Sequence, residues 1–201
     1  MAGTISAKDV AELRKQTGAG MMECKRALQE SDGDTEKAIA VLRKTGAAKA
    51  EKRAGRSASE GVIGSYIHFN GRVGVLIELN CETDFVARTD DFQTLSKDLA
   101  LHIASARPIA VSADDLPKEL VAKEREFIEA QVAESGKPEA VREKMIKGKL
   151  QKFRKERALL DQPFVKDDKQ TSGDLVKGVA SKVGENVVVR RFVRYELGDE
   201  L

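Results

Sequence analysis

The stretch VIGSYIHFNGRVGVLIELNC, residues 62–81, carries the clearest structural pattern in the chain. Apolar residues alternate with other residues on both sides of Asn70-Gly71, a pair that accepts the left-handed backbone angles of a type I′ turn. In the second arm the alternating residues share one side of an extended chain and predict a core face, formed by Val73, Val75, Ile77, Leu79 and Cys81. The pattern predicts a β-hairpin with strands over residues 62–69 and 72–81.

The residues that follow the hairpin predict helices and one more strand. A helix that ends before Pro108 carries one apolar stripe, made of Phe92, Leu95, Leu99 and Ile103. Residues 117–160 predict a helical hairpin with a break at Gly136-Lys137-Pro138, and a short helix and a strand over residues 187–197 complete the chain. We therefore predict an α+β fold with an antiparallel sheet of at least three strands and helices against one face. A sheet this small has exposed edges and a thin core, which favours self-association.

The sequence before the hairpin predicts a separate small helical domain. Residues 6–46 read as three short helices, in which Ser6 and Asp34 are N-caps, Gly18-Ala19-Gly20 is a break and Gly46 closes the third helix. Residues 47–60 contain no large apolar side chain and several basic ones, which is typical of a linker; a helix in its first half stays open. The expected domains are a three-helix domain (1–46), a basic linker (47–60) and an α+β core (61–201).

Composition excludes several classes of protein. Of 201 residues, 41% are hydrophobic and 34% charged, which indicates a folded chain rather than a disordered one. The net charge of +2, from 35 basic and 33 acidic residues, is not that of a bulk nucleic-acid coat. No apolar run reaches the ~18 residues that span a bilayer, and the first ten residues lack a secretory pattern. The two distant cysteines, Cys24 and Cys81, fit a reducing cytosol, so we expect a cytoplasmic protein without a membrane partner.

Residue types that support catalysis or metal binding are scarce. Neither His68 nor His102 has a second histidine or a cysteine at ligand spacing, and His102 is expected to be a partly buried packing residue. Cys81 closes an apolar strand face and is expected to be a buried side chain rather than a nucleophile. A hydrolase that uses Glu82 and Asp84 would lack an oriented base, and no phosphate-binding glycine motif is present. We expect no catalytic residue, no metal and no cofactor.

One loop does not fit a purely structural interpretation. Thr83-Asp84-Phe85-Val86 places an apolar pair beside a carboxylate between a strand and a helix. Either Phe85 packs back into its own core and Asp84 caps the following helix, or Phe85 is an exposed anchor for another protein. The spacing leaves both interpretations open.

Several segments resemble a known family. Residues 13–25, LRKQTGAGMMECK, resemble the N-terminal signature of bacterial elongation factor Ts, and residues 78–87, ELNCETDFVA, resemble its second signature. Residues 162–165 and 191–198 are similar to two further family segments, so the resemblance covers nearly the whole chain. With one core module, the chain resembles the short form of the family, in which two chains supply the two modules; the resemblance therefore implies a homodimer.

The resemblance implies a function in translation. The family is a guanine-nucleotide exchange factor, not an enzyme, for the GTPase elongation factor Tu; it binds the GDP-bound and nucleotide-free partner and stays bound until GTP enters. The three helices are then a ubiquitin-associated-like domain that docks on the partner's nucleotide-binding domain, and His68 matches a partner-contacting histidine. The matching docking positions are Val10, Leu13, Arg14, Met21 and Met22. The element linked to displacing the partner's magnesium is Thr83, Asp84, Phe85 and Val86.

For Met21 and Met22, spacing alone favours a place in the core, and whether one of them is the exposed contact stays open.

An alternative function is an RNA-binding translation accessory protein, because residues 142–157 hold eight basic side chains against Glu143 and Glu156. No aromatic residues stand ready there to stack on bases, so we expect a solvated helix face and no nucleic-acid partner.

Overall fold

The computed structural model of the chain describes residues 5–199. Residues 1–4 and 200–201, at the outer ends of the first and last expected domains, lie outside this range. The fold is α+β, and the chain forms two compact units. One unit contains the chain up to Gly61 together with Asn80–Gln93 and Val176–Val188; the other contains Val62–Leu79, Thr94–Leu175 and the chain from Val189 onward.

Three helices at the start of the chain form a small core of their own. They are α1 (Ala7–Thr17), α2 (Met21–Glu30) and α3 (Thr35–Arg53). The side chains of Ser6 and Asp34 accept hydrogen bonds from backbone N–H groups in the first turns of α1 and α3, so both predicted N-caps are confirmed. The buried core cluster consists of Val10, Leu13, Cys24, Ala27, Leu28 and Ala38.

The prediction that Gly46 closes the third helix is wrong. Helix α3 continues through Gly46 to Arg53, so the first part of the expected linker is helical. Gly46 is buried, and a Cβ atom at this position would lie 2.8 Å from Oγ of Ser181 in helix α8 (Ser172–Val183). The glycine therefore provides room for a neighbouring helix instead of a stop signal, and it stays in the helix at a cost of about 1 kcal/mol relative to alanine.

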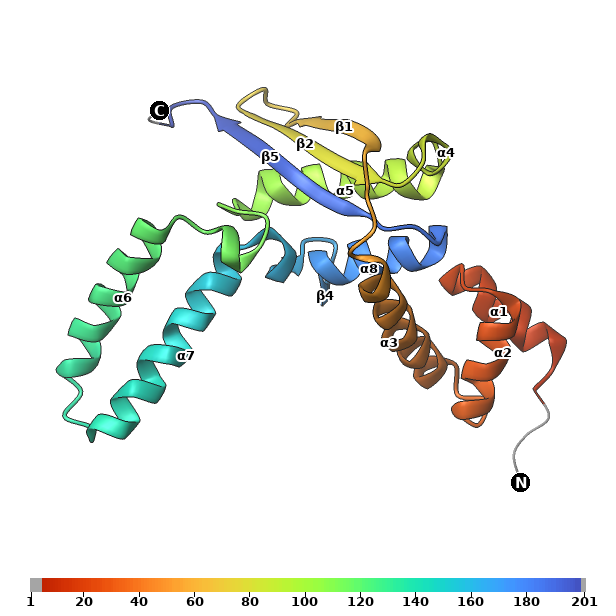
Figure 1. Ribbon diagram of the computed structural model, residues 1–201, viewed down its shortest axis with the longest axis horizontal. Coiled ribbons are helices and arrows are strands. Elements are labelled where there is room, and N and C mark those ends of the chain that lie inside the picture. Colours follow the sequence, from red (N-terminus) through yellow and green to blue (C-terminus); the bar gives the residue numbers. More distant parts are fainter. Residues whose placement is uncertain (1–4, 200–201) are drawn as a thin grey trace. The chain divides into compact units, whose positions relative to one another are not determined.

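A three-stranded sheet forms the centre of the second unit. Its strands are β1 (Glu60–Ile67), β2 (Val73–Cys81) and β5 (Val188–Glu196), in the order β1-β2-β5. Helix α5 (Asp90–Ala106) runs along one face of the sheet (Figure 1). The predicted stripe of α5 is confirmed, and so is the predicted core face of β2 except at Val73, which is half-buried at the start of the strand. The remaining residues are at most 2% exposed: Val75, Ile77, Leu79, Cys81, Phe92, Leu95, Leu99 and Ile103.

The hairpin is present, but its turn is not of type I′. The carbonyl of His68 accepts a hydrogen bond from the N–H of Gly71 at 2.8 Å, and the N–H of His68 donates to Val73 O at 2.9 Å. Gly71 has φ +67°, whereas Asn70 keeps a negative φ and accepts from the N–H of Arg72 through its side chain. A type I′ turn requires positive φ at both central residues. The connection is longer than the two residues that the Asn-Gly signal predicts.

The alternation of buried and exposed side chains changes phase within strand β5. Val187 and Val189 are buried, whereas Val193 and Tyr195, which continue the same alternation, are exposed. Two consecutive exposed residues, at 190 and 191, lie between these pairs, so the side chains change faces there. The outer half of the strand therefore turns apolar side chains away from α5.

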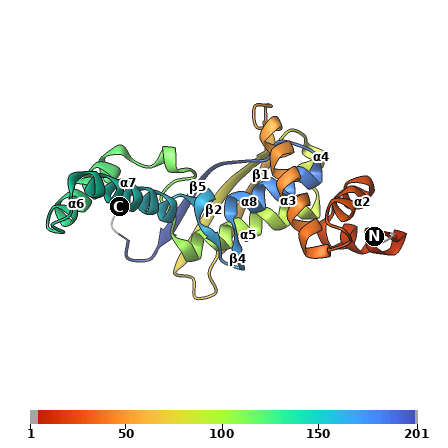
Figure 2. The ribbon, with the colours of Figure 1, turned by 90° about the horizontal axis from the view of Figure 1, so that it is seen from below.

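A helical hairpin completes the second unit. Helices α6 (Lys118–Ala133) and α7 (Glu139–Arg157) lie side by side in both views (Figures 1 and 2). Two 3-10 turns, Ala113–Asp115 and Leu159–Asp161, flank the hairpin, and β3 (Pro163–Phe164) pairs antiparallel with β4 (Asp167–Thr171). Within residues 5–199, no helix combines the length and the hydrophobicity that crossing a bilayer demands.

Candidate functional site

The loop after β2 contains a single helical turn, α4 (Asp84–Ala87). Thr83 is its N-cap: its backbone is extended, and its hydroxyl oxygen accepts a hydrogen bond from the N–H of Val86 at 3.4 Å. Ala87 is the buried residue of the turn, and Val86 is half-buried. The turn thus has one small side chain in the core, two half-buried residues, Asp84 and Val86, and one exposed residue, Phe85.

Phe85 lies on the outward side of α4. Its side chain is 77% exposed, so the interpretation that Phe85 packs back into the core is wrong. Asp84 does not cap α5 either; its carboxylate accepts a hydrogen bond from the guanidinium of Arg88 at 2.8 Å. A large exposed aromatic ring on a short, capped turn is the arrangement that protein interfaces use for an anchor.

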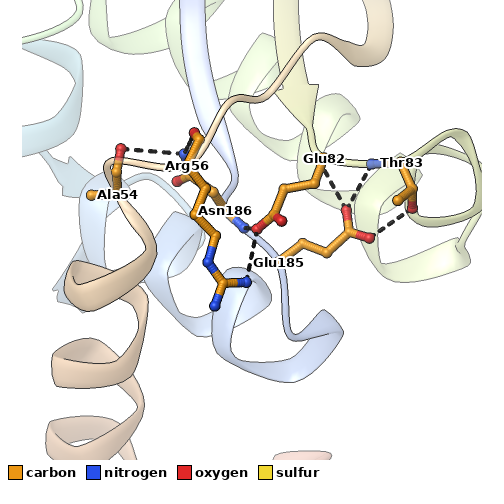
Figure 3. A network of polar contacts seen from close by, with 6 residues as sticks. All are labelled: Ala54, Arg56, Glu82, Thr83, Glu185 and Asn186. Atoms are coloured by element: carbon orange, nitrogen blue, oxygen red, sulfur yellow. Dashed lines mark hydrogen bonds and ion pairs between the residues drawn. The ribbon is translucent and has the colours of Figure 1, made fainter.

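A polar network holds the chain just before α4 (Figure 3). The carboxylate of Glu185 accepts hydrogen bonds from the N–H groups of Glu82 and Thr83, each at 3.0 Å, and from the Thr83 hydroxyl at 2.6 Å. The carboxylate of Glu82 accepts from the N–H of Asn186 at 2.7 Å and lies 3.5 Å from the guanidinium of Arg56. These bonds join the end of β2 to the segment that follows α8.

Glu185 and Asn186 are residues of the candidate functional site that were not expected from the sequence. The local signal was a polar Glu-Asn pair, after Gly184, between a helix and a strand that are both rich in valine. Such a pair is typical of an ordinary connection, and its contact with residues about 100 positions away leaves no local pattern.

The proposed docking positions of the three-helix domain differ in exposure. Val10 and Leu13 lie in the buried core, and Leu13 has no exposed surface. Arg14 is exposed, and both methionines at the start of α2 are exposed, Met21 by 46% and Met22 by 75%. The preference for a core position from spacing is therefore wrong for both methionines, and either is available to another protein.

His68 belongs to the other compact unit. It lies at the end of β1, where its Nδ1 is 3.0 Å from the hydroxyl of Tyr66. Its ring packs on Phe69 with a centroid distance of 4.4 Å, and Phe69 is 92% exposed. The hairpin tip therefore carries an exposed aromatic patch.

Cys81 and His102 are buried, and their surroundings indicate a structural role and not a catalytic one. Burial, and then the negative charge of Glu185, raise the pKa of the Cys81 thiol to about 11, so Cys81 is protonated at neutral pH and a poor nucleophile. His102 is fully buried rather than partly buried, and both of its ring nitrogens have hydrogen-bond partners. Among residues 5–199, no three His, Cys, Asp or Glu side chains gather in a way that would bind a metal ion.

The basic residues of the return arm lie on α7, where most are exposed. Contrary to the expectation that this stretch lacks an aromatic residue for stacking, it contains Phe153. The ring of Phe153 is half-buried, and the guanidinium of Arg157 lies 5.7 Å from its centroid. The ring is therefore covered by a side chain of its own helix, an arrangement that does not favour stacking on a base.

Comparison with known proteins finds one family along nearly the whole chain. The family profile described as elongation factor TS matches residues 6–199. An elongation factor Ts of Moorella thermoacetica is 56% identical over 195 residues, which cover 97% of this chain and 96% of that protein. The proteins of the same name from Carboxydothermus hydrogenoformans and Thermosipho melanesiensis are each 54% identical, covering 98% and 97% of this chain and 91% and 100% of their own lengths.

Proposed function

The chain belongs to the elongation factor Ts family of translation elongation factors, and from this premise we propose that it is a guanine-nucleotide exchange factor for elongation factor Tu in the cytoplasm. In this proposal it binds the GDP-bound partner, promotes release of GDP and stays on the nucleotide-free partner until GTP binds. The observation that carries the proposal is the exposed Phe85 on a capped turn.

The physical basis is preferential binding to one state of the partner. A GTPase retains GDP because phosphate and magnesium charges are satisfied together in a preorganised pocket. Another protein accelerates release only if it binds better to the conformation in which that pocket is disrupted. By linkage, GDP must then weaken the binding of this protein by the same factor by which the protein weakens the binding of GDP.

Burial of Phe85 in the partner provides part of the required free energy. Moving an exposed phenylalanine into an apolar site contributes about 2–3 kcal/mol. At about 1.4 kcal/mol per factor of ten, this corresponds to about one to two orders of magnitude in the release equilibrium. Strong exchange therefore needs further contacts, which we assign to the three-helix domain and to the hairpin tip at His68.

Within the three-helix domain, we propose that Arg14, Met21 and Met22 contact the partner directly. Flexible thioether side chains adapt to a surface that changes shape, and both methionines are exposed. Val10 and Leu13 support these contacts from within the core, since a direct contact at Leu13 would require that core to open.

We assign Asp84 to the hydrogen bonds around the partner's magnesium site and not to acid–base catalysis. Its carboxylate is already paired with Arg88, and the exchange reaction makes and breaks no covalent bond. The protein is therefore proposed to act without enzymatic chemistry and without a cofactor of its own.

We also propose that two chains associate through the outer face of the sheet. This face, opposite α5, carries exposed apolar side chains on all three strands and just beyond the end of β5: Ile63, Ile67, Leu76, Val193, Tyr195 and Leu197. A contiguous apolar surface of this kind is unfavourable in water, and a second copy of the same face would cover it.

The proposed exchange activity is tested by stopped-flow release of a fluorescent GDP analogue from elongation factor Tu, with excess unlabelled GDP as the trap. We expect the release rate to rise with the concentration of this protein and then saturate. The acceleration should be strongest at magnesium concentrations at which elongation factor Tu alone retains GDP tightly. A release rate that stays the same at every concentration would refute the proposed function.

A further inference from the structure

We propose that Glu185 is the positioning residue that holds α4 and thereby presents Phe85 to the partner. The proposal deepens the exchange function proposed above and rests on it. Glu185 itself is not proposed to touch the nucleotide or the magnesium ion.

The carboxylate of Glu185 satisfies the backbone at the point where β2 ends and α4 begins. The N–H groups of Glu82 and Thr83 lie beyond the end of β2 and before the first residue of α4. Both donate to Oε2 of Glu185 at 3.0 Å, and the Thr83 hydroxyl donates to Oε1 at 2.6 Å (Figure 3). Hydrogen bonds to an ionised acceptor are stronger than neutral ones, so this side chain fixes two consecutive residues in direct contact with the turn.

The next residue fixes the same connection from another side. The N–H of Asn186 donates to the carboxylate of Glu82, and its carboxamide donates to the carbonyl oxygens of Ala54 at 3.3 Å and Arg56 at 2.8 Å. Asn186 is 5% exposed, so the donor side of these bonds is shielded from water, whereas the backbone at Ala54 and Arg56 lies in exposed residues. The segment after α8 therefore links the chain before α4 to the chain just beyond the end of α3.

The turn needs such support because it has little stability of its own. An isolated helix of four residues does not persist in water, since the first helical turn is costly to form. Ala87 is the one buried residue of α4, and Phe85, at 77% exposed, adds little packing within the chain. A rigid presentation lowers the entropy lost when Phe85 is bound, which is why the carboxylate that fixes the turn matters for exchange.

The test compares Glu185→Gln with Phe85→Ala and with the double variant in the GDP-release assay. The amide keeps the size of the side chain but loses the charge and one acceptor oxygen. Loss of the charge weakens the hydrogen bonds that Glu185 accepts from its two or three donors. We therefore expect the maximal release rate to fall about tenfold and the half-saturating concentration to change by less than about twofold. If Glu185 acts through Phe85, the double variant is no slower than Phe85→Ala alone.

The matched control is Asp98→Asn, which makes the same change of charge at a carboxylate paired with Lys166 in the other unit. It should release GDP at the wild-type rate. If Glu185→Gln does not fold, Glu185→Asp replaces it, because it leaves the Thr83 cap of α4 intact but draws the carboxylate back from its three donors by one methylene group. Rate losses that multiply in the double variant, or an equal loss in Asp98→Asn, would overturn the proposal.

A second readout keeps the proposal separate from the exchange function. Amide hydrogen exchange of the protein alone should show slow exchange at Glu82 and Thr83 in the wild type and fast exchange at both in Glu185→Gln. Equal protection of these amides in both proteins would overturn the positioning role. A wild-type protein that leaves GDP release unchanged would instead refute the exchange function, and the amide measurement would still decide whether Glu185 holds the turn.

Discussion

At the scale of single residues, His102 has the most closely defined chemistry in the core. Its Nδ1 accepts a hydrogen bond from the backbone N–H of Val165 at 3.2 Å, so its Nε2 carries the proton and donates to Oε1 of Gln162 at 3.0 Å. Burial lowers the pKa of His102 below its usual range, although the bond to Gln162 opposes this shift. The imidazole is therefore neutral in the folded protein and joins α5 to the segment that follows α7.

This environment predicts a loss of stability in mild acid. Below about pH 6.5 the histidine of the unfolded chain takes up a proton, whereas the buried neutral ring does not, so the unfolded state is favoured as the pH falls. We expect the urea midpoint to be highest above pH 6.5 and to decrease between pH 6.5 and pH 5.5. His102→Gln should be less stable throughout but show a smaller decrease over this interval.

An unchanged slope in His102→Gln would show that other groups cause the acid sensitivity. The carboxyl groups whose pKa is lowered in the folded state, such as those of Glu23 and Glu196, titrate below their ordinary values near 4.5 and act only at lower pH.

The sequence drew attention to the residues of the candidate site but did not determine their environments. The segment Thr83–Val86 stood out because an apolar pair follows a carboxylate, but its spacing did not decide whether Phe85 is exposed. That outcome depends on the cap at Thr83 and on Glu185, which is distant in sequence. The burial of His102 likewise depends on Gln162 and on a backbone N–H, and neither partner leaves a periodic pattern.

At the scale of elements, close packing between β1 and α5 depends on Gly64. A Cβ atom at this position would overlap the hydroxyl oxygen of Ser96 on α5 and lie 3.2 Å from Cγ2 of Ile77 on β2. Ser96 and Ile77 are buried, so an added methyl group would force side chains within the packed core to shift. The glycine thus allows the sheet and the helix to approach each other.

We therefore expect Gly64→Ala to lower the free energy of unfolding by about 1–3 kcal/mol, because the added methyl group overpacks the core. Gly148→Ala on α7 is the matched control: no atom lies within 4 Å of its added Cβ, and alanine in a helix interior should stabilise by up to about 1 kcal/mol. Urea unfolding measures both. Equal effects of the two substitutions would contradict the packing role of Gly64.

Most elements followed from periodicity, because strands and helices with one buried face repeat apolar residues at fixed spacing. The second strand of the hairpin and the stripe of α5 are of this kind. The errors arose where tertiary contacts determined the outcome. Gly46 continues a helix because α8 packs there, and β5 changes faces near Arg190 although its apolar alternation continues in the sequence.

At the scale of the whole molecule, the apolar outer face of the sheet predicts a dimer that a single charge disrupts. Leu76 lies on the central strand β2 and is exposed in the single chain. Leu76→Glu would bury a charge in the proposed interface, so we expect sedimentation equilibrium to give the mass of one chain instead of two. Val141→Glu on α7, also at an exposed apolar position, should remain a dimer. A monomeric wild-type protein, or a dimer that persists in Leu76→Glu, would contradict this assignment.

If the exposed ring of Phe85 drives release of the nucleotide, the Phe85→Ala variant must have a lower maximal GDP-release rate than the wild type. Phe127→Ala is the control, because Phe127 is also exposed (64%) but lies on α6. We expect Phe85→Ala to reduce the rate about 10- to 100-fold with a change in unfolding free energy below about 0.5 kcal/mol, and Phe127→Ala to leave the rate within about twofold of wild type. A folded Phe85→Ala variant that releases GDP as fast as the wild type would contradict the account.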